Sequence, residues 1–273
     1  MIYESSWGPV YYDVSGPPDG LVVVYTHGVS MDGRSFAAQE AALAERYRVV
    51  VWDMPGHGQS FALTNGFAYD MAAECLIGIL DQMGVDSAVL VGLSLGGHIN
   101  QYVAHHYPER VMALVDIGST NLHLGFSRWL APLFKLYLGF SRLLPARLFY
   151  YWLAHDRAKQ PQTRQYLQES AARAGKKQIL AITEGMLQCS LVGIAAPPPQ
   201  PLLLTHGEWD QPFLIKHIVN WHKRTPGSQY AVIPQAGHLA NQDNPAAFNQ
   251  VLLAFLETVA TQISRPVRLK SAI

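Results

Sequence analysis

Short apolar runs alternate along the chain with segments whose apolar residues recur at helical spacing. Five runs are rich in Val, Leu and Ile without polar alternation, which predicts strands buried on both faces of a sheet. They occupy residues 21–26, 48–53, 87–93, 111–117 and 201–205. Helical spacing marks residues 35–46, 68–84, 95–107, 213–223 and 245–263. A run at 10–14 predicts an antiparallel edge strand, and a short run at 230–233 predicts a further strand.

This order of elements predicts the fold class. Strands that alternate with helices favour an α/β fold with a mostly parallel, doubly wound sheet. The length of 273 residues suits one large domain of this kind that carries an insertion. The last helix has a clear start signal, because Asp243 and Asn244 are candidate caps and Pro245 suits the first helical position.

The alternation of strands and helices stops between residues 119 and 199. This stretch has little strand character, is rich in Leu, Tyr, Phe, Arg and Ala, and ends in the proline-rich run 195–201. Such a run predicts a stiff, extended linker. We therefore expect a helical insertion at 119–199, entered after one core strand and left before the next. The predicted core comprises residues 1–118 and 200–273.

Residues 122–155 are the most unusual part of this insertion. They are rich in large apolar residues and contain Arg128, Lys135, Arg142 and Arg147 but no Asp or Glu. The first three bases are seven residues apart and share a helical face, and the charges and prolines make the segment unsuited to spanning a bilayer. Three interpretations stay open. The helices pack on the core with their bases in water, which we prefer, or their apolar face lines a hydrophobic substrate pocket, or the segment makes a weak contact with an anionic membrane surface.

The candidate chemistry begins with a Gly-x-Ser-x-Gly motif at residues 92–96. The motif joins a predicted strand to a predicted helix, and this context is typical of a nucleophile elbow with Ser94 at its tip. Gly92 and Gly96 remove the Cβ atoms that would collide across so tight a turn. The N-terminus of the following helix favours negative charge that develops beside Ser94. Ser94 is therefore the candidate nucleophile.

A serine hydroxyl needs a general base, and the base needs a carboxylate that orients it. On a scaffold of this type the acid and then the histidine follow the serine in the sequence. Asp210 and His238 fit this order, and each lies in a loop just after a predicted strand. Active sites of open α/β sheets form at the carboxyl ends of strands. The predicted catalytic residues are therefore Ser94, Asp210 and His238.

Three neighbouring residues need separate hypotheses. Glu208 is a rival acid because it lies two residues before Asp210. Asp116 is a second rival because it lies near the end of the strand that follows the nucleophile helix, although a structural role suits it better. Trp209 is a candidate pocket wall because it adjoins Asp210.

Other polar residues in the motif loops have simpler explanations. We expect His27 and His57 to hydrogen-bond the local backbone, His98 to lie behind the elbow, and Asp53 to brace its loop. No His-Glu-x-x-His or Cys-x-x-Cys spacing and no Walker or Gly-x-Gly-x-x-Gly motif occurs. We therefore expect neither a metal nor a cofactor.

Taken together, the motifs resemble α/β-hydrolase-fold proteins of the serine-nucleophile, esterase- and lipase-like branch over nearly the whole chain. The matching segments are residues 26–29, 52–60, 92–97, 207–210 and 237–238. The resemblance implies that the backbone N–H groups of Val29 and Leu95 form the oxyanion hole. It also implies that residues 119–199 are a helical cap over the active site. A serine at the elbow argues against the dehalogenase and epoxide hydrolase branches, which use an aspartate there.

Composition narrows the partners and the compartment. Twenty Lys and Arg balance twenty Asp and Glu, so nothing indicates a nucleic-acid partner. Cys75 and Cys189 are far apart in the sequence, and the first residues lack a signal-peptide pattern. These features favour free thiols and a cytoplasmic location. The sequence leaves the oligomeric state open.

The sequence thus predicts a serine hydrolase that cleaves carboxylic esters carrying small or medium hydrophobic groups. The same triad also suits a lactonase or a carbon–carbon bond hydrolase. An alternative from another class is a ligand receptor on this fold that turns over slowly, although no partner surface is evident.

Overall fold

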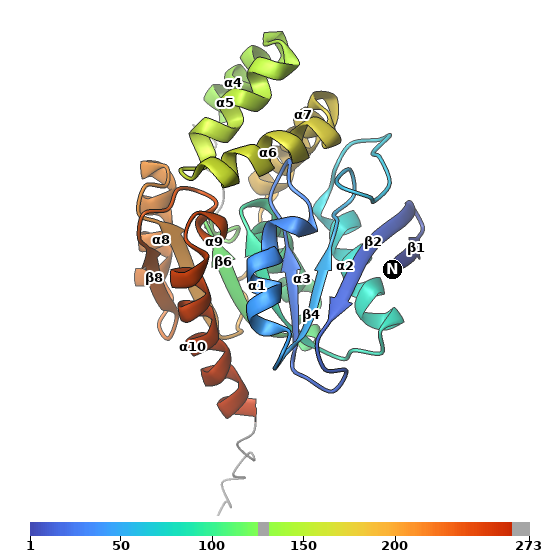
Figure 1. The fold of residues 1–273 in the computed structure, drawn as a ribbon, viewed down its shortest axis with the longest axis vertical. Coiled ribbons are helices and arrows are strands. Elements are labelled where there is room, and N and C mark those ends of the chain that lie inside the picture. The colour runs from blue at the N-terminus through green and yellow to red at the C-terminus, as the bar shows by residue number, and fades with distance from the viewer. Residues whose placement is uncertain (125–130, 264–273) are drawn as a thin grey trace, which may run out of the picture.

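Eight strands form one sheet in the computed structural model, which describes residues 1–124 and 131–263 (Figure 1). The strands are β1 (Ile2–Ser5), β2 (Gly8–Ser15), β3 (Val22–Thr26), β4 (Arg48–Trp52), β5 (Ala88–Leu93), β6 (Val111–Ile117), β7 (Leu202–Gly207) and β8 (Gln229–Ile233). Their order in the sheet is β1-β2-β4-β3-β5-β6-β7-β8. Strands β3 to β8 are parallel, whereas β2 is antiparallel to both β1 and β4. The predicted mostly parallel α/β sheet is confirmed.

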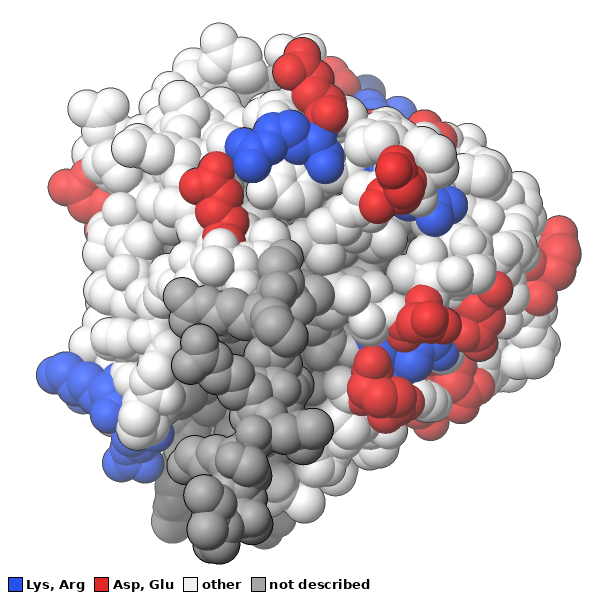
Figure 2. Space-filling view, turned by 90° about the horizontal axis from the view of Figure 1, so that it is seen from below, with Lys and Arg blue, Asp and Glu red and all other residues white. Residues whose placement is uncertain are grey.

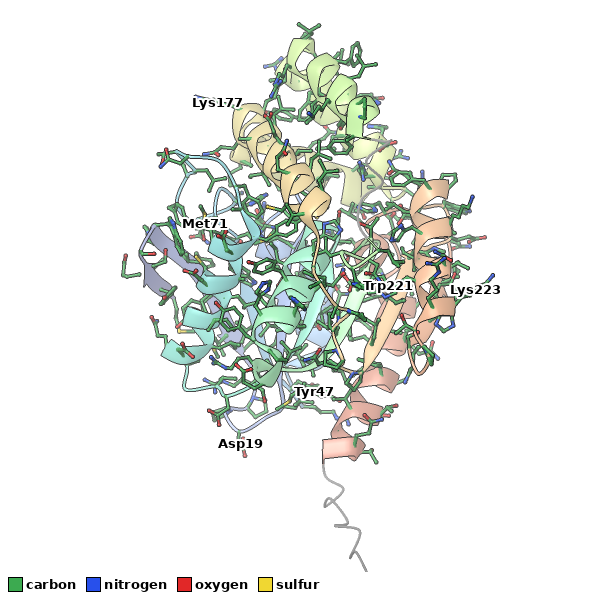
Figure 3. All side chains as sticks on the ribbon, turned by 180° about the vertical axis from the view of Figure 1, so that it is seen from behind. Asp19, Tyr47, Met71, Lys177, Trp221 and Lys223 are labelled. Carbon is green, nitrogen blue, oxygen red and sulfur yellow. The ribbon has the colours of Figure 1, made fainter. Side chains whose placement is uncertain are left out.

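Helices cover both faces of the sheet because its central strands have apolar side chains on both sides. Every residue of β3, β5 and β7 is buried. Helices α1 (Ala37–Leu43) and α10 (Pro245–Ile263) pack on one face. Helices α2 (Tyr69–Gln82), α3 (Leu95–His106) and α8 (Pro212–Arg224) pack on the other, where the buried Trp221 of α8 joins the core (Figure 3). The short elements η1 (Gly33–Phe36), η2 (Pro108–Arg110) and α9 (Ala240–Asp243) lie in the connections.

The N-terminal part of the sheet differs from the prediction. The strand expected at the edge is β2, but it lies between β1 and β4. The true edge strand, β1, has only four residues, and they alternate between exposed and half-buried positions, so the sequence carries no apolar run there. The predicted helix 35–46 is also shorter, because η1 replaces its first turn and α1 ends at Leu43.

Among the described residues, four helices connect β6 to β7 and lie over one end of the sheet (Figure 1). We call them the cap helices: α4 (Ala131–Leu143), α5 (Ala146–Arg157), α6 (Pro161–Ala174) and α7 (Lys176–Val192). The expected position of a helical insertion agrees with this arrangement. The division of the chain into a core of residues 1–118 and 200–273 and a cap of 119–199 stays a prediction. Arg128, one of the four bases noted above, lies outside the described residues.

Candidate active site

Ser94 occupies a strained turn between β5 and α3. Its backbone angles are φ 54° and ψ −113°, a region that costs free energy for any residue with a side chain. Two contacts from β6 and the residues after it hold this turn. The Ser94 N–H donates to the Ile117 carbonyl at 2.8 Å, and the Ser119 hydroxyl donates to the Ser94 carbonyl at 3.0 Å. The predicted sharp turn at Ser94 is therefore present and is supported from the neighbouring strand.

The glycines around Ser94 are required by close backbone approaches. A Cβ atom on Gly92 would collide with the backbone of Gly96 and Gly97, and one on Gly96 would collide with the Thr26 carbonyl. Neither collision involves a flexible side chain that could move away. Substituting either glycine would therefore displace the turn that presents the Ser94 hydroxyl.

His238 and Asp210 meet although 28 residues separate them. The Nδ1 atom of His238 lies 3.1 Å from Oδ1 and 3.2 Å from Oδ2 of Asp210, and both side chains are almost completely buried. The Gln211 N–H also donates to Asp210 Oδ1 at 2.7 Å. Burial alone would raise the pKa of Asp210, but His238 and this N–H outweigh burial, and its pKa lies below the ordinary value. Asp210 therefore carries a stabilised negative charge beside the imidazole.

The two rival acids are engaged elsewhere. Glu208 accepts a hydrogen bond from the Gln235 N–H at 2.9 Å and is exposed. Asp116 is buried in β6, and its carboxylate oxygens have no hydrogen-bond partner in the described part of the chain. Burial raises the pKa of Asp116 to about 7. Ser119 lies near the carboxylate and opposes this rise in the pKa, although the Ser119 hydroxyl donates its hydrogen bond to the Ser94 carbonyl. Neither rival is paired with His238.

Ser94 and His238 line one cavity of about 140 Å³ between the sheet and the cap helices. Most of its wall is apolar and comes from all four cap helices. These side chains are Phe134, Leu138, Phe149, Leu153, Leu167, Ile179, Leu180, Met186 and Leu187. Trp209 is not part of this wall, so the prediction for it is wrong. Its side chain is 49% exposed, and Phe213 and Leu214 of α8 line the cavity instead.

Arg157, at the end of α5, gives this apolar cavity a fixed positive charge. Among the lining residues that the structure describes, it is the only Asp, Glu, Lys or Arg. Its Nε atom lies 3.0 Å from Asp156 Oδ2, and its charge helps to lower the pKa of Asp210. The Arg157 carbonyl accepts a hydrogen bond from the His238 N–H at 2.9 Å. This contact ties the loop of His238 to the cap helices.

The remaining motif residues have the local roles expected of them. Asp53 accepts hydrogen bonds from backbone N–H groups at 2.7 and 2.8 Å and so braces its loop. His27 and His57 accept the N–H groups of Met54 and Ser30. His98 contacts Tyr69 and Thr120 and also lines the cavity. Burial lowers the pKa of His57 and of His98 to about 3, so both rings are neutral hydrogen-bonding groups.

Two residues next to the His238–Asp210 pair were missed from the sequence. Gly118 has φ 61°, and a Cβ atom there would lie 3.0 Å from His238 Nδ1. Asp243 was predicted to cap α10, but its carboxylate instead accepts the N–H groups of Gly237, Lys159 and Gln160 at 2.8–3.0 Å. Asn244 is the residue that caps α10. For Gly118, a glycine directly after β6 was the only sequence signal available. Asp243 gave no signal for this role, because two of its three partners, Lys159 and Gln160, are distant in sequence.

The two amide groups singled out by the resemblance are free to bind an anion. Val29 follows β3 and lines the cavity, and Leu95 is the first residue of α3. Neither backbone N–H donates a hydrogen bond to any residue of 1–124 or 131–263. Both follow parallel, adjacent strands, so they lie at the same edge of the sheet as Ser94.

Comparison with known proteins identifies the family. A family model described as alpha/beta hydrolase fold matches residues 22–245. The chain belongs to this family. A protein of Bacillus subtilis (strain 168), provisionally named 2-succinyl-6-hydroxy-2,4-cyclohexadiene-1-carboxylate synthase, is 28% identical over 89% of this chain and 93% of its own.

One further related sequence and one similar solved structure extend the comparison. The pimeloyl-[acyl-carrier protein] methyl ester esterase of Aeromonas hydrophila is 28% identical over 87% of this chain and 96% of its own. The crystal structure of the enol-lactonase from Burkholderia xenovorans LB400 superimposes with a TM-score of 0.84 at 18% identity, and it covers 94% of this chain and 100% of that one. Family membership and the related esterase support a hydrolase, whereas the likeness to the enol-lactonase structure shows the fold.

The described residues carry neither a candidate metal site nor a membrane-spanning helix. No group of three or more His, Cys, Asp or Glu side chains there is placed to hold a metal ion. None of the helices formed by these residues is long and apolar enough to cross a membrane. Cys75 and Cys189 are both free thiols, but Cys189 is only half-buried.

Proposed function

We propose that the protein hydrolyses carboxylic esters through an acyl-enzyme formed on Ser94. The observation that carries this proposal is that Ser94 and His238 line one cavity while Asp210 holds His238 from behind. The Nε2 atom of His238 is buried and has no hydrogen-bond partner in the described part of the chain. It is therefore available to take the Ser94 proton once a substrate orders the site.

The residues then act in a fixed order. Ser94 Oγ attacks the ester carbonyl carbon while His238 Nε2 takes the hydroxyl proton. Asp210 keeps the proton-bearing Nδ1 of His238 in place and stabilises the imidazolium. The oxyanion accepts hydrogen bonds from the Val29 and Leu95 N–H groups, and one such donor is typically worth ~10²–10³ in rate. His238 protonates the departing alcohol, and water, activated by the same histidine, releases the acid and restores Ser94.

The cavity supports a hydrophobic substrate of small or medium size. An apolar cavity of about 150 Å³ is large enough to hold benzene, and the cavity here has a similar volume, about 140 Å³. Its aliphatic and aromatic wall favours an unbranched or ring-bearing apolar group over a polar one. The relative named as a methyl ester esterase agrees with an ester as the reacting group.

Arg157 adds a second requirement to this substrate. A guanidinium in a partly desolvated, apolar cavity attracts a carboxylate or another anionic group more strongly than the same group in water does. Asp156 offsets part of its charge. We therefore propose that the preferred esters carry an anionic group on the same molecule as the apolar chain.

The test is turnover of p-nitrophenyl esters from two to eight acyl carbons by wild type, Ser94→Ala and His238→Ala. Each variant should lower kcat/KM by ~10³-fold or more, because the residues act as a unit. Ser6→Ala, at an exposed serine distant in sequence from the motifs, is the matched control and should leave kcat/KM unchanged. Equal rates in wild type and both triad variants would end the proposal.

Other substrates, tested on the same variants, separate the alternative functions. Lactones and vinylogous diketones as substrates distinguish a lactonase or a carbon–carbon bond hydrolase from an esterase. Stabilisation of the protein by small ligands with negligible turnover of all three substrate classes would favour a receptor.

A further inference from the structure

Helices α4 and α5 form a hairpin with two apolar faces. One face lines the cavity through Phe134, Leu138, Phe149 and Leu153. The opposite face carries six large apolar side chains that are 38–82% exposed. They are Leu136, Phe140, Leu143, Leu148, Tyr151 and Trp152. We call these six residues the outer apolar face.

The spacing of these residues shows that the outer apolar face is a property of both helices. On α4, Leu136, Phe140 and Leu143 follow an i, i+4, i+7 pattern and are 70%, 62% and 82% exposed. On α5, Leu148, Tyr151 and Trp152 follow an i, i+3, i+4 pattern and are 38–53% exposed. Residues at these spacings share one side of a helix. A surface helix normally exposes polar residues to solvent. Both α4 and α5 instead expose large apolar residues on the outer apolar face.

The exposed side chains of the two helices form one surface. A groove between α4 and α5 is lined by Tyr137, Phe140, Ser141, Leu144, Leu148 and Trp152, which joins the two exposed rows. Thirteen large apolar side chains are exposed among the described residues, and six of them belong to this hairpin. In Figure 1 the hairpin stands at the end of the molecule farthest from the C-terminal helix α10. A contiguous apolar patch of this kind marks an interaction site rather than ordinary surface.

The charges near the outer apolar face are mostly positive. Lys135 and Arg147 lie on the hairpin without a salt bridge to any described residue, and no Asp or Glu occurs between residues 131 and 155. Arg142 is paired with Glu184 at 2.7 Å. Lys177 stands at the same end of the molecule (Figure 3). The face at the opposite end shows acidic and basic side chains together (Figure 2).

We propose that the outer apolar face docks on the surface of an anionic phospholipid bilayer. Large apolar side chains flanked by lysine and arginine partition into the interface of such a membrane, where the chains enter the acyl boundary and the bases meet lipid phosphates. A second copy of this chain fits less well. Two hairpins packed face to face would bring Lys135 and Arg147 of both copies together without an acidic partner.

Docking would place the cavity close to the bilayer, because its wall and the outer apolar face are opposite sides of the same two helices. This inference rests on exposure and charge alone and does not depend on the proposed esterase activity. Binding is therefore measured with Ser94→Ala, so that hydrolysis of lipid cannot disturb it.

The experiment is cosedimentation with vesicles of phosphatidylcholine alone and of phosphatidylcholine with phosphatidylglycerol, at low and high salt. The protein should bind the anionic vesicles more tightly, and salt should weaken that binding. Phe140→Glu and Leu143→Glu remove apolar surface without touching the core. Each should weaken partitioning about tenfold, and Lys135→Gln with Arg147→Gln should remove the preference for anionic vesicles.

Trp7→Glu is the matched control, because Trp7 is a large exposed apolar residue on the distant β1–β2 turn. It should bind vesicles like wild type, and far-ultraviolet circular dichroism should show all variants folded. Absence of binding to either vesicle would overturn the proposal, as would equal loss in Trp7→Glu and Phe140→Glu. A concentration-dependent dimer that Leu143→Glu abolishes, without vesicle binding, would assign the face to a second copy instead.

Discussion

Gly118 lies directly against the imidazole ring of His238. Its φ of 61° belongs to the left-handed region, and a Cβ atom there would lie 3.0 Å from His238 Nδ1 and 3.2 Å from Asp210 Oδ2. The loop after β6 thus packs directly against both His238 and Asp210. A residue with no known chemistry of its own sets how closely this loop approaches them.

Gly118→Ala should lower activity more than stability. The methyl group must push the His238 ring away from Asp210, and the left-handed backbone costs about 1–2 kcal/mol for a residue with a Cβ. We expect kcat for p-nitrophenyl esters to fall about 10–100-fold, since small displacements of catalytic groups have effects of this size. Gly139→Ala, on α4 with open space around the added atom, is the control. A wild-type kcat in Gly118→Ala would show that the close contact between residue 118 and His238 is not critical for catalysis.

Asp210→Asn and Asp116→Asn should behave differently in the same assay. An amide at position 210 reverses the hydrogen-bonding preference of His238, and in a triad this lowers kcat by about 10⁴. Asp116 has no contact with His238, so its variant should keep kcat close to wild type. Loss of kcat in Asp116→Asn with retention in Asp210→Asn would mean that the acid is assigned wrongly.

Asp116 should also make stability depend on pH. Burial raises its pKa to about 7 in the folded protein, whereas an unperturbed aspartate has a pKa of about 3.9. The folded state therefore binds a proton that the unfolded chain has released, and stability falls as pH rises from about 4 to 7. In urea unfolding, the free energy of unfolding of wild type should fall by at most about 4 kcal/mol relative to that of Asp116→Asn over this pH range. Parallel pH curves for the two proteins would contradict the buried, protonated carboxyl.

Asp210 contributes with the opposite sign. Its pKa is lower in the folded protein, so its stabilising effect is present above about pH 4 and is lost as pH falls through the folded value. Asp210→Asn should therefore be less stable than wild type near neutral pH, and the difference should shrink in acid. The same urea series measures both effects.

Arg157→Gln should change which ester the protein prefers. For a pair of p-nitrophenyl esters that differ only in a terminal carboxylate or its methyl ester, wild type should have the lower KM for the anionic member. The variant should lose this difference and keep its KM for the neutral ester, because the apolar wall is unchanged. Arg34→Gln, an exposed arginine outside the cavity, should behave like wild type. Equal KM values for the two esters in wild type would remove Arg157 from the substrate site.

Much of the site could be predicted because its signals are local. Gly92, Ser94 and Gly96 form a turn that only a few sequences permit, and the strand-like and helical patterns on either side give its context. The loops of Asp210 and His238 follow apolar runs that read as buried strands. Parallel strands bring all such loops to one edge of the sheet, so their neighbourhood followed from the pattern alone.

The sequence by itself determined the class of fold, the reactive turn and the order of the candidate triad, since each depends on residues a few positions apart. Only the tertiary structure decided that His238 contacts Asp210 rather than Glu208 or Asp116, and that Gly118 lies against them. It also decided that the apolar residues of 131–155 face two ways, toward the cavity and outward. Amphipathic spacing shows which residues share a side of a helix. Which side is buried depends on what packs against it, and those contacts come from segments far away in the chain.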